Sequence, residues 1–304
     1  MTPDRSKIAL NVRTRLGIHA RAKNINLEIV LVRYVHERLL YRLGQSKYKD
    51  RFILKGAMLQ TLWLDDPFRP TRDMDLLAFG ENDQASLLSI FREILAIESA
   101  DGIQFELDSL AINDIRLDNE YGGLHVEALS YLGRSPIKVQ IDLGFGDAVV
   151  PEAREIDFPA LLDFPSPRIR AYPQEVVIAE KLHAIVILGW RNSRMKDFYD
   201  LWMMSQHFSF DIVPLRSAVS ATFSRRQTDL PENIPVGLSE EFVADVTNAK
   251  LWTNFISRNI LAQSPSSFSD VLADLRTFLM PVIENARGML SVEAVWEPGG
   301  PWRN

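Results

Sequence analysis

The hydrophobic pattern of the chain changes near Pro173, and this change restricts the folds that the chain can adopt. Before that point, short apolar runs with strand-like alternation mix with helical periodicity, and residues 137–145 form the clearest strand-like run. Five prolines between Pro151 and Pro173 exclude one regular helix, so this segment is predicted to cross to a second half. Beyond it the pattern is helical. The sequence therefore predicts an α+β fold, with a mixed sheet flanked by helices and an all-helical C-terminal region.

The individual elements can be predicted from periodicity and from capping residues. Asn24 is predicted to cap a helix over residues 25–44, which Gly44 ends. Strands are predicted over 52–54, 71–78, 103–107, 125–129 and 137–145, and further helices over 57–64, 85–98, 176–188, 195–205, 212–223, 239–247, 250–263 and 268–284.

Composition narrows the class of protein. The 304 residues include no cysteine, which excludes disulfides and thiolate metal sites and fits a reducing cytoplasm. No apolar run is long enough to cross a bilayer, and the first residues lack the apolar stretch of a signal peptide, so a cytoplasmic protein is expected. The five histidines show no ligand spacing for zinc. His183 is predicted to pack between helices, and His125 to lie on a strand face.

The formal net charge of -6 is distributed unevenly. Residues 1–55 contain 13 Lys and Arg against 4 Asp and Glu, a balance of +9, and the remainder carries 21 against 36, a balance of -15. A basic N-terminal segment on an acidic body can hold a polyanion locally. The alternative interpretation, with equal weight, is a solvated helical surface that has no ligand.

Asp73 and Asp75 are the strongest candidates for chemistry. They lie two residues apart in a predicted strand beside Met74 and Leu76, and residues two apart on a strand share a face. Neighbouring carboxylates repel unless a cation lies between them, and oxygen ligands favour Mg²⁺ or Mn²⁺. A pair of surface carboxylates at a strand edge is the alternative. Asp142, near the end of an apolar strand, is predicted to join them as a third carboxylate, or else to be a turn residue.

Two further patterns point to phosphate binding. Gly56 joins a predicted strand to a predicted helix, and a helix N-terminus with a close backbone suits phosphate. Lys181 lies in a strongly apolar helix and needs a partner, either a carboxylate or a phosphate. Arg194, Asp197 and Asp200 share one face of the next helix. They could form a buried salt-bridge network with Lys181, or Lys181 and Arg194 could meet nucleotide phosphates while an aspartate orients them, and both interpretations can hold together.

Taken in order, these stretches resemble the AbiEii/AbiGii family of nucleotidyltransferase toxins, within the DNA polymerase β-like nucleotidyltransferase superfamily. The matching stretches are FILKGA at 52–57, RPTRDMDLL at 69–77, QIDLGFGD at 140–147, EKLHAI at 180–185 and RMKDFYDL at 194–201. Each is weak alone, but their order and spacing over residues 50–205 are specific. One departure is Ala57, where the family often has Gly or Ser after the glycine, so a hydroxyl that could touch phosphate is missing.

The resemblance implies a fold, a reaction and partners. It implies a nucleotidyltransferase domain, expected over 49–165, and a helical domain, expected over 166–304; the charge distribution adds a basic helical segment over 1–48 that is expected to pack on the core. The resemblance also implies transfer of NMP from an NTP to RNA, with the tRNA 3′ end as the expected acceptor, by the toxin of a type IV toxin–antitoxin system with a cognate antitoxin. A protein or small-molecule acceptor, or a degenerate module without activity, are the alternatives.

The expected site residues fall into three groups. Asp73, Asp75 and Asp142 are expected to bind Mg²⁺, with Mn²⁺ as an alternative. Asp73, Asp75, Lys181 and Asp197 are expected to be catalytic. The residues expected to bind the nucleotide are Lys55, Gly56, Ala57, Thr71, Lys181, Arg194 and Lys196.

Overall fold

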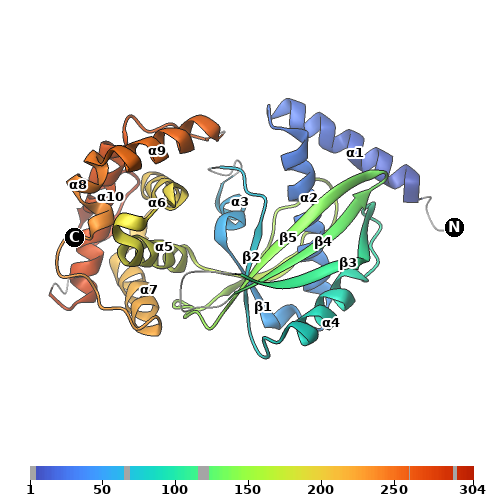
Figure 1. Cartoon of the computed structure of the whole chain (residues 1–304), viewed down its shortest axis with the longest axis horizontal. Coiled ribbons are helices and arrows are strands. Elements are labelled where there is room, and N and C mark those ends of the chain that lie inside the picture. Colours follow the sequence, from blue (N-terminus) through green and yellow to red (C-terminus); the bar gives the residue numbers. More distant parts are fainter. Residues whose placement is uncertain (1–4, 65–68, 116–122, 260, 290–292) are drawn as a thin grey trace. The chain divides into compact units, whose positions relative to one another are not determined.

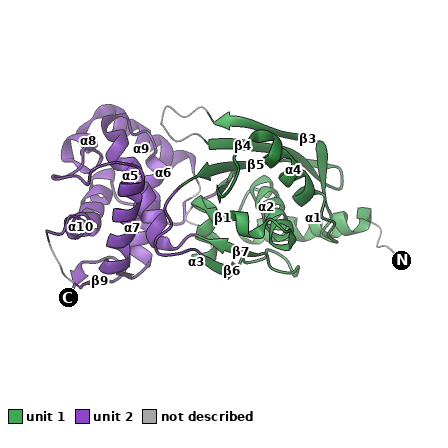
Figure 2. Cartoon of the chain, turned by 90° about the horizontal axis from the view of Figure 1, so that it is seen from below, with its two compact units in different colours: residues 1–65, 71–146, 154–171 green, residues 66–70, 147–153, 172–304 purple. Residues whose placement is uncertain are grey.

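The computed structural model describes residues 5–64, 69–115, 123–259, 261–289 and 293–304. The chain forms two compact units, which Figure 2 distinguishes by colour. Unit 1 comprises residues 1–65, 71–146 and 154–171, and unit 2 comprises residues 66–70, 147–153 and 172–304. The chain thus passes from one unit to the other several times. The three-part division at residues 48 and 165 remains a prediction.

Unit 1 is built on a seven-stranded mixed sheet in the order β3-β4-β5-β2-β1-β7-β6. Figure 1 shows β3, β4 and β5 side by side within it. The strands are β1 (Phe52–Lys55), β2 (Met74–Ala78), β3 (Ile103–Ile115), β4 (Gly123–Leu132), β5 (Ser135–Phe145), β6 (Arg154–Asp157) and β7 (Arg168–Ala171). β2 pairs in parallel with β5, and β1 in parallel with β7, whereas the other neighbours are antiparallel. The predicted mixed sheet is therefore confirmed.

Alternation along β4 and β5 gives this part of the sheet one apolar and one polar face. In β5, Ile137, Val139, Ile141 and Leu143 are buried, while Lys138, Gln140 and Asp142 are partly or fully exposed. Residues two apart on a strand share a face, so the buried residues of β5 lie on one face, and α2 (Leu27–Gln45) packs against it. A second helix, α4 (Gln84–Leu95), contacts β3. The polar set forms the opposite face, where the candidate site lies.

α2 differs from the predicted helix at both ends. Its N-cap is Asn26, not Asn24, because the Asn26 side chain accepts a hydrogen bond from the backbone N–H of Glu28 at 2.8 Å, whereas Asn24 has a positive φ of 52°. The helix also continues past Gly44. A Cβ at Gly44 would lie 2.5 Å from the carbonyl oxygen of Arg168, so the glycine allows close packing on β7 instead of ending the helix.

The proline-rich segment does not simply cross to the second half. β6 and β7 lie within it as the last two strands of the sheet of unit 1, and β7 pairs with β1. This corrects the prediction that the segment is a connection. Preceding α2, α1 (Arg5–Ala22) forms the basic N-terminal helix, and its buried side chains are Ala9, Val12, Leu16 and Ala20.

Unit 2 is mostly helical, as predicted. It contains α5 (Gln174–Leu188), α6 (Met195–His207), α7 (Ile212–Arg225), α8 (Glu240–Ala244), α9 (Val246–Arg258) and α10 (Phe268–Ala286). Residue 260, within the predicted helix over 250–263, lies outside the described residues. A small antiparallel sheet of β8 (Phe210–Asp211), β9 (Val295–Trp296) and β10 (Trp302–Arg303) was not predicted. No helix in the described part of the chain has the length and apolar character of a membrane span.

One histidine of α2 gives unit 1 a measurable response to pH. His36 is 1% exposed, and burial lowers its pKa from 6.5 to about 4. Between these values the unfolded chain binds more protons than the folded chain, so stability falls as pH falls. The loss between pH 7 and pH 5 is expected to be about 2 kcal/mol, at 1.36 kcal/mol per pKa unit.

Urea unfolding of wild type and of His36→Leu at pH 7 and pH 5 measures this loss. The variant should lose less stability than wild type on acidification, whereas His207→Leu, at an exposed position, should behave as wild type does. An equal loss in wild type and His36→Leu would contradict the assignment.

Candidate active site

The carboxylates of β2 and β5 are brought side by side by strand pairing. Asp75 is the register partner of Asp142 on the neighbouring parallel strand, and both lie on the polar face of the sheet. Neighbouring strands are about 4.8 Å apart, so the two side chains start from adjacent positions. Asp73 comes one residue before β2 begins and is exposed. The backbone oxygen of Asp73 accepts a hydrogen bond from Thr71 Oγ1 at 3.3 Å.

A row of polar residues continues this pair across the sheet. Lys55 of β1 is the register partner of Asp75, and His125 of β4 is the register partner of Asp142. Directly paired residues on neighbouring strands share a face. The order across the polar face is therefore Lys55, Asp75, Asp142 and His125. The predicted nucleotide-binding residue Lys55 thus lies opposite a predicted metal ligand.

The segment that follows Gly56 differs from the predicted helix. The predicted helix over 57–64 is a 3₁₀ turn over Gly56–Leu59 and then a single α-turn, α3 (Gln60–Trp63). These turns are too short to present a helix N-terminus to phosphate, which corrects the predicted helix, whereas nucleotide binding by the backbone at Gly56 and Ala57 stays a prediction; Ala57 is buried. Gly56 has a φ of 72°, and a Cβ here would lie 2.0 Å from Asp75 Oδ2. Its lack of a side chain makes room for the Asp75 carboxylate.

The three predicted carboxylate ligands suit Mg²⁺ chemically, but their side chains do not converge on one point as the ligands of a metal site would. Asp73, Asp75 and Asp142 offer only oxygen atoms, which hard divalent cations prefer. Within the described residues, no three or more Asp, Glu or His side chains are arranged so that they could hold a metal ion. The match between these residues and Mg²⁺ therefore rests on the chemistry of the carboxylate oxygens and on the register of Asp75 with Asp142.

His125 and Glu127 are part of this face and were not predicted as site residues. His125 Nδ1 lies 2.5 Å from Asp142 Oδ1, and its Nε2 lies 3.0 Å from Glu127 Oε1. Burial alone would lower the pKa of His125, but hydrogen bonds to Asp142 and Glu127 raise it overall. The alternation of β4 and β5 could have placed these residues on the polar face, but the pairing of His125 with Asp142 depends on strand register.

A cluster of charged side chains is buried in unit 2. Lys181 Nζ of α5 lies 2.6 Å from Asp197 Oδ1 and 2.9 Å from Asp200 Oδ2, both on α6. Arg69 binds Asp200 through two hydrogen bonds of 2.9 Å, from Nε and Nη2. Arg194 Nε lies 2.8 Å from Asp197 Oδ2. The predicted salt-bridge network is therefore present, and it also contains Arg69, to which the sequence assigned no role.

The electrostatics of this charged cluster favour the ionised forms of Lys181, Asp197 and Asp200. Burial alone would raise the pKa of Asp200, but Arg69 and Lys181 outweigh burial and hold this pKa well below its usual range. For Asp197, Lys181 and Arg194 likewise outweigh burial and lower the pKa. Burial would lower the pKa of Lys181, but Asp197 and Asp200 raise it overall. Three cations against two carboxylates leave the charged cluster with a net charge of +1.

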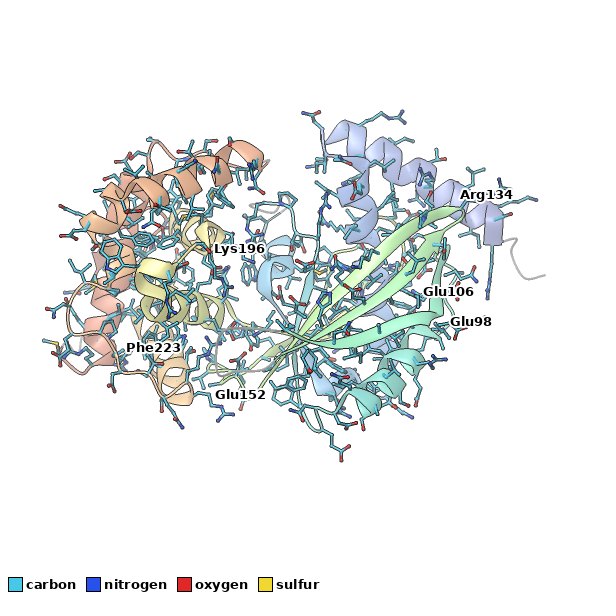
Figure 3. The ribbon with its side chains drawn as sticks, viewed as in Figure 1. Glu98, Glu106, Arg134, Glu152, Lys196 and Phe223 are labelled. Carbon is cyan, nitrogen blue, oxygen red and sulfur yellow. The ribbon has the colours of Figure 1, made fainter. Side chains whose placement is uncertain are left out.

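The charged cluster does not include every residue predicted to bind nucleotide. Lys196 is exposed at the start of α6, where it is labelled in Figure 3, while the neighbouring Met195 and Asp197 are buried. The Arg194 side chain is half exposed, so it can reach an external anion while it contacts Asp197. Lys181, by contrast, is 14% exposed and already contacts two carboxylates.

Comparison with known proteins identifies a family. The family described as "Nucleotidyl transferase AbiEii toxin, Type IV TA system" matches residues 38–274. No protein with a curated description matches the chain.

Two solved structures share low sequence identity with the chain. A nucleotidyltransferase candidate from H. pylori is 13% identical, with coverage of 84% of this chain and 95% of that chain and a TM-score of 0.46. JHP933 from Helicobacter pylori is 14% identical, with coverage of 83% and 90% and a TM-score of 0.45.

Proposed function

Because the chain belongs to the AbiEii family of nucleotidyl transferase toxins of type IV toxin–antitoxin systems, we propose that it transfers NMP from an NTP to an RNA acceptor. The tRNA 3′ end is the acceptor we favour. The observation that carries the proposal is the register of Asp75 with Asp142 on the polar face of the sheet. Two carboxylates side by side, with Gly56 leaving room for one of them, suit phosphoryl chemistry that depends on a divalent cation.

The reaction can be written with its atoms balanced. The acceptor hydroxyl oxygen forms a bond to the α-phosphorus of the NTP, and the bond from that phosphorus to the bridging oxygen of pyrophosphate breaks. Pyrophosphate leaves, and the hydroxyl proton passes to a base, for which we propose Asp142. Mg²⁺ held by Asp73, Asp75 and Asp142 would supply positive charge to the triphosphate and to the attacking oxygen. Mn²⁺ has the same ligand preference.

The charged cluster of unit 2 supports nucleotide binding as a second element of the proposal. Its net charge is positive, and Arg194 is half exposed beside Asp197. We propose that Arg194 and Lys181 bind the triphosphate and that Asp197 orients Lys181, whose Nζ lies 2.6 Å from Asp197 Oδ1. We propose smaller contributions to nucleotide binding from Thr71, Lys196, Lys55 and the backbone at Gly56 and Ala57.

The basic helix α1 supports a polyanionic acceptor. From Arg5 to Asn26 the chain has Lys or Arg at six positions and neither Asp nor Glu. Lys7, Arg21 and Lys23 are exposed. Arg134, at the turn between β4 and β5, adds a cation near this helix in unit 1 (Figure 3). Phosphate backbones bind such surfaces through counterion release. An RNA acceptor and the absence of cysteine fit action in the cytoplasm, and the family implies a cognate antitoxin as partner.

Incubation of the purified protein with total tRNA and each α-³²P-labelled NTP in turn, with Mg²⁺ or EDTA, tests the proposal. We expect label on intact tRNA in the presence of Mg²⁺ only, and none on tRNA whose 3′ hydroxyl has been oxidised by periodate. Label on a protein or a small molecule in lysate, with none on tRNA, would replace RNA as the acceptor. If no acceptor takes up label, the protein is instead an interaction module that has lost transferase activity.

A charge-neutralised variant of α1 tests the acceptor surface. The triple change Lys7→Gln, Arg21→Gln and Lys23→Gln should weaken tRNA binding and lower its salt slope by about 2 to 3 units, if each cation neutralises one phosphate. The matched control Arg225→Gln, Lys250→Gln and Arg258→Gln changes the net charge equally, at exposed positions of unit 2. Binding isotherms at several salt concentrations measure both. If the two variants weaken tRNA binding equally, the net charge of the protein explains the loss, and α1 is not the acceptor surface.

A further inference from the structure

His125 lies between two carboxylates on the polar face of the sheet. Its Nδ1 is 2.5 Å from Asp142 Oδ1, and its Nε2 is 3.0 Å from Glu127 Oε1. Glu127 Oε1 also accepts a hydrogen bond from Lys138 Nζ at 2.7 Å. The four side chains come from only two strands, β4 and β5, which pair directly. They form a continuous chain of contacts that ends at the proposed base.

This arrangement restricts the side chain of Asp142. A carboxylate on a strand can rotate about two bonds, and a short charge-assisted hydrogen bond holds it in one orientation. The imidazole is itself held, because Glu127 binds its other nitrogen and Lys138 in turn binds Glu127. Outer partners of this kind orient ligating or reacting groups, and their loss commonly costs 10- to 100-fold in metal affinity or activity.

We infer that His125 is a positioning residue for Asp142. By binding Oδ1 through Nδ1, it sets the orientation of the carboxylate and leaves Oδ2 available for the acceptor hydroxyl. Glu127 and Lys138 fix the imidazole in the plane that this contact requires. The inference rests on the proposed function, since it assigns Asp142 a reacting partner. It adds a residue from β4, a strand in which the sequence indicated no site residue.

Two substitutions of His125 test the inference, because each can keep one of the two imidazole contacts and lose the other. In His125→Asn the side-chain amide nitrogen can take the place of Nδ1 and keep the hydrogen bond to Asp142. In His125→Gln the longer side chain can take the place of Nε2 and keep the contact with Glu127 instead. A merely structural cross-strand pair would tolerate both equally, whereas a positioning role requires the Asp142 contact.

For transfer activity we expect a clear difference between the two variants. His125→Gln should lower kcat by about 10- to 100-fold with little change in KM for the NTP. His125→Asn should stay within about fivefold of wild type. The control His207→Gln, at an exposed position of unit 2, should leave kcat unchanged. Thermal melts would show that all variants are folded. If wild type is active and the Asn and Gln variants have equal kcat values, the inference is overturned and the proposed function still stands.

Cation binding gives a readout that does not depend on turnover. Titration of the protein with Mn²⁺, followed by electron paramagnetic resonance, should give weaker binding for His125→Gln by about tenfold and near wild-type binding for His125→Asn. Equal Mn²⁺ affinity for the two variants would overturn the positioning role. A wild type that neither binds Mn²⁺ nor transfers nucleotide would overturn the proposed function, and the inference would fail with it.

Discussion

Asp75→Asn is expected to reduce nucleotide transfer by about three orders of magnitude and to leave the fold intact. Asparagine has almost the same shape as aspartate, so the space beside Gly56 stays filled. What disappears is one negative charge in the pair that Asp75 forms with Asp142. Charge stabilisation of several kcal/mol is typical of a bound divalent cation, and each 1.36 kcal/mol corresponds to tenfold in rate.

Initial rates of label transfer to tRNA, for wild type and for Asp75→Asn at saturating NTP, measure this loss. Asp73→Asn should show a comparable loss if both residues hold the cation. Asp108→Asn, on the exposed part of β3, is the matched control and should retain full activity. Circular dichroism melts of the variants would separate loss of chemistry from loss of structure. Retained activity in Asp75→Asn would remove the carboxylate pair from the mechanism.

Asp200→Ala is expected to destabilise the protein by roughly 3–5 kcal/mol, the usual cost of removing one partner from a buried ion pair. The Asp200 side chain is 1% exposed and accepts both hydrogen bonds of Arg69, and it contacts Lys181 at 2.9 Å. Its removal leaves two buried cations with only Asp197 to balance them. The low pKa of Asp200, which Arg69 and Lys181 maintain against burial, reflects the same coupling.

Urea unfolding at pH 7 gives the free energy of unfolding for this comparison. The control Asp229→Ala, at an exposed position of unit 2, should change stability by no more than about 0.5 kcal/mol. The double change Arg69→Met with Asp200→Leu should recover part of the loss, because it replaces both partners by apolar groups. A small effect of Asp200→Ala would mean that the charged cluster serves ligand binding and not stability.

Local pattern was sufficient for much of unit 2 and for the strands that carry Asp75 and Asp142, whereas Asp73, predicted within a strand, lies just before β2. α6 and α10 have apolar faces that run the length of each helix, and α5 is apolar on nearly all sides; each was predicted to within a few residues. β5 was predicted from alternation, and Asp142 was singled out because a lone charge in an apolar run is costly. In these cases the burial of each side chain follows from neighbours in the sequence.

The errors occur where distant segments decide the structure. Gly44 looked like a helix end, but it permits contact with Arg168, which is far away in the sequence. Likewise, a long helix was predicted after Gly56, but only short turns follow, and the glycine makes room for Asp75. His125 was assigned no role because its partner, Asp142, is fixed by strand register, which local periodicity does not specify. The metal ligands and nucleotide-binding residues remain predictions.

The passage of the chain between its two units has a consequence for inheritance. Unit 2 takes residues 66–70 and 147–153 from within stretches that otherwise belong to unit 1. Arg69, in the first of these pieces, binds Asp200 and stands four residues before Asp73. No single breakpoint in the gene can therefore separate one intact unit from the other. Exchange of either unit between related genes requires several breakpoints, because the residues of each unit come from separate stretches of the chain.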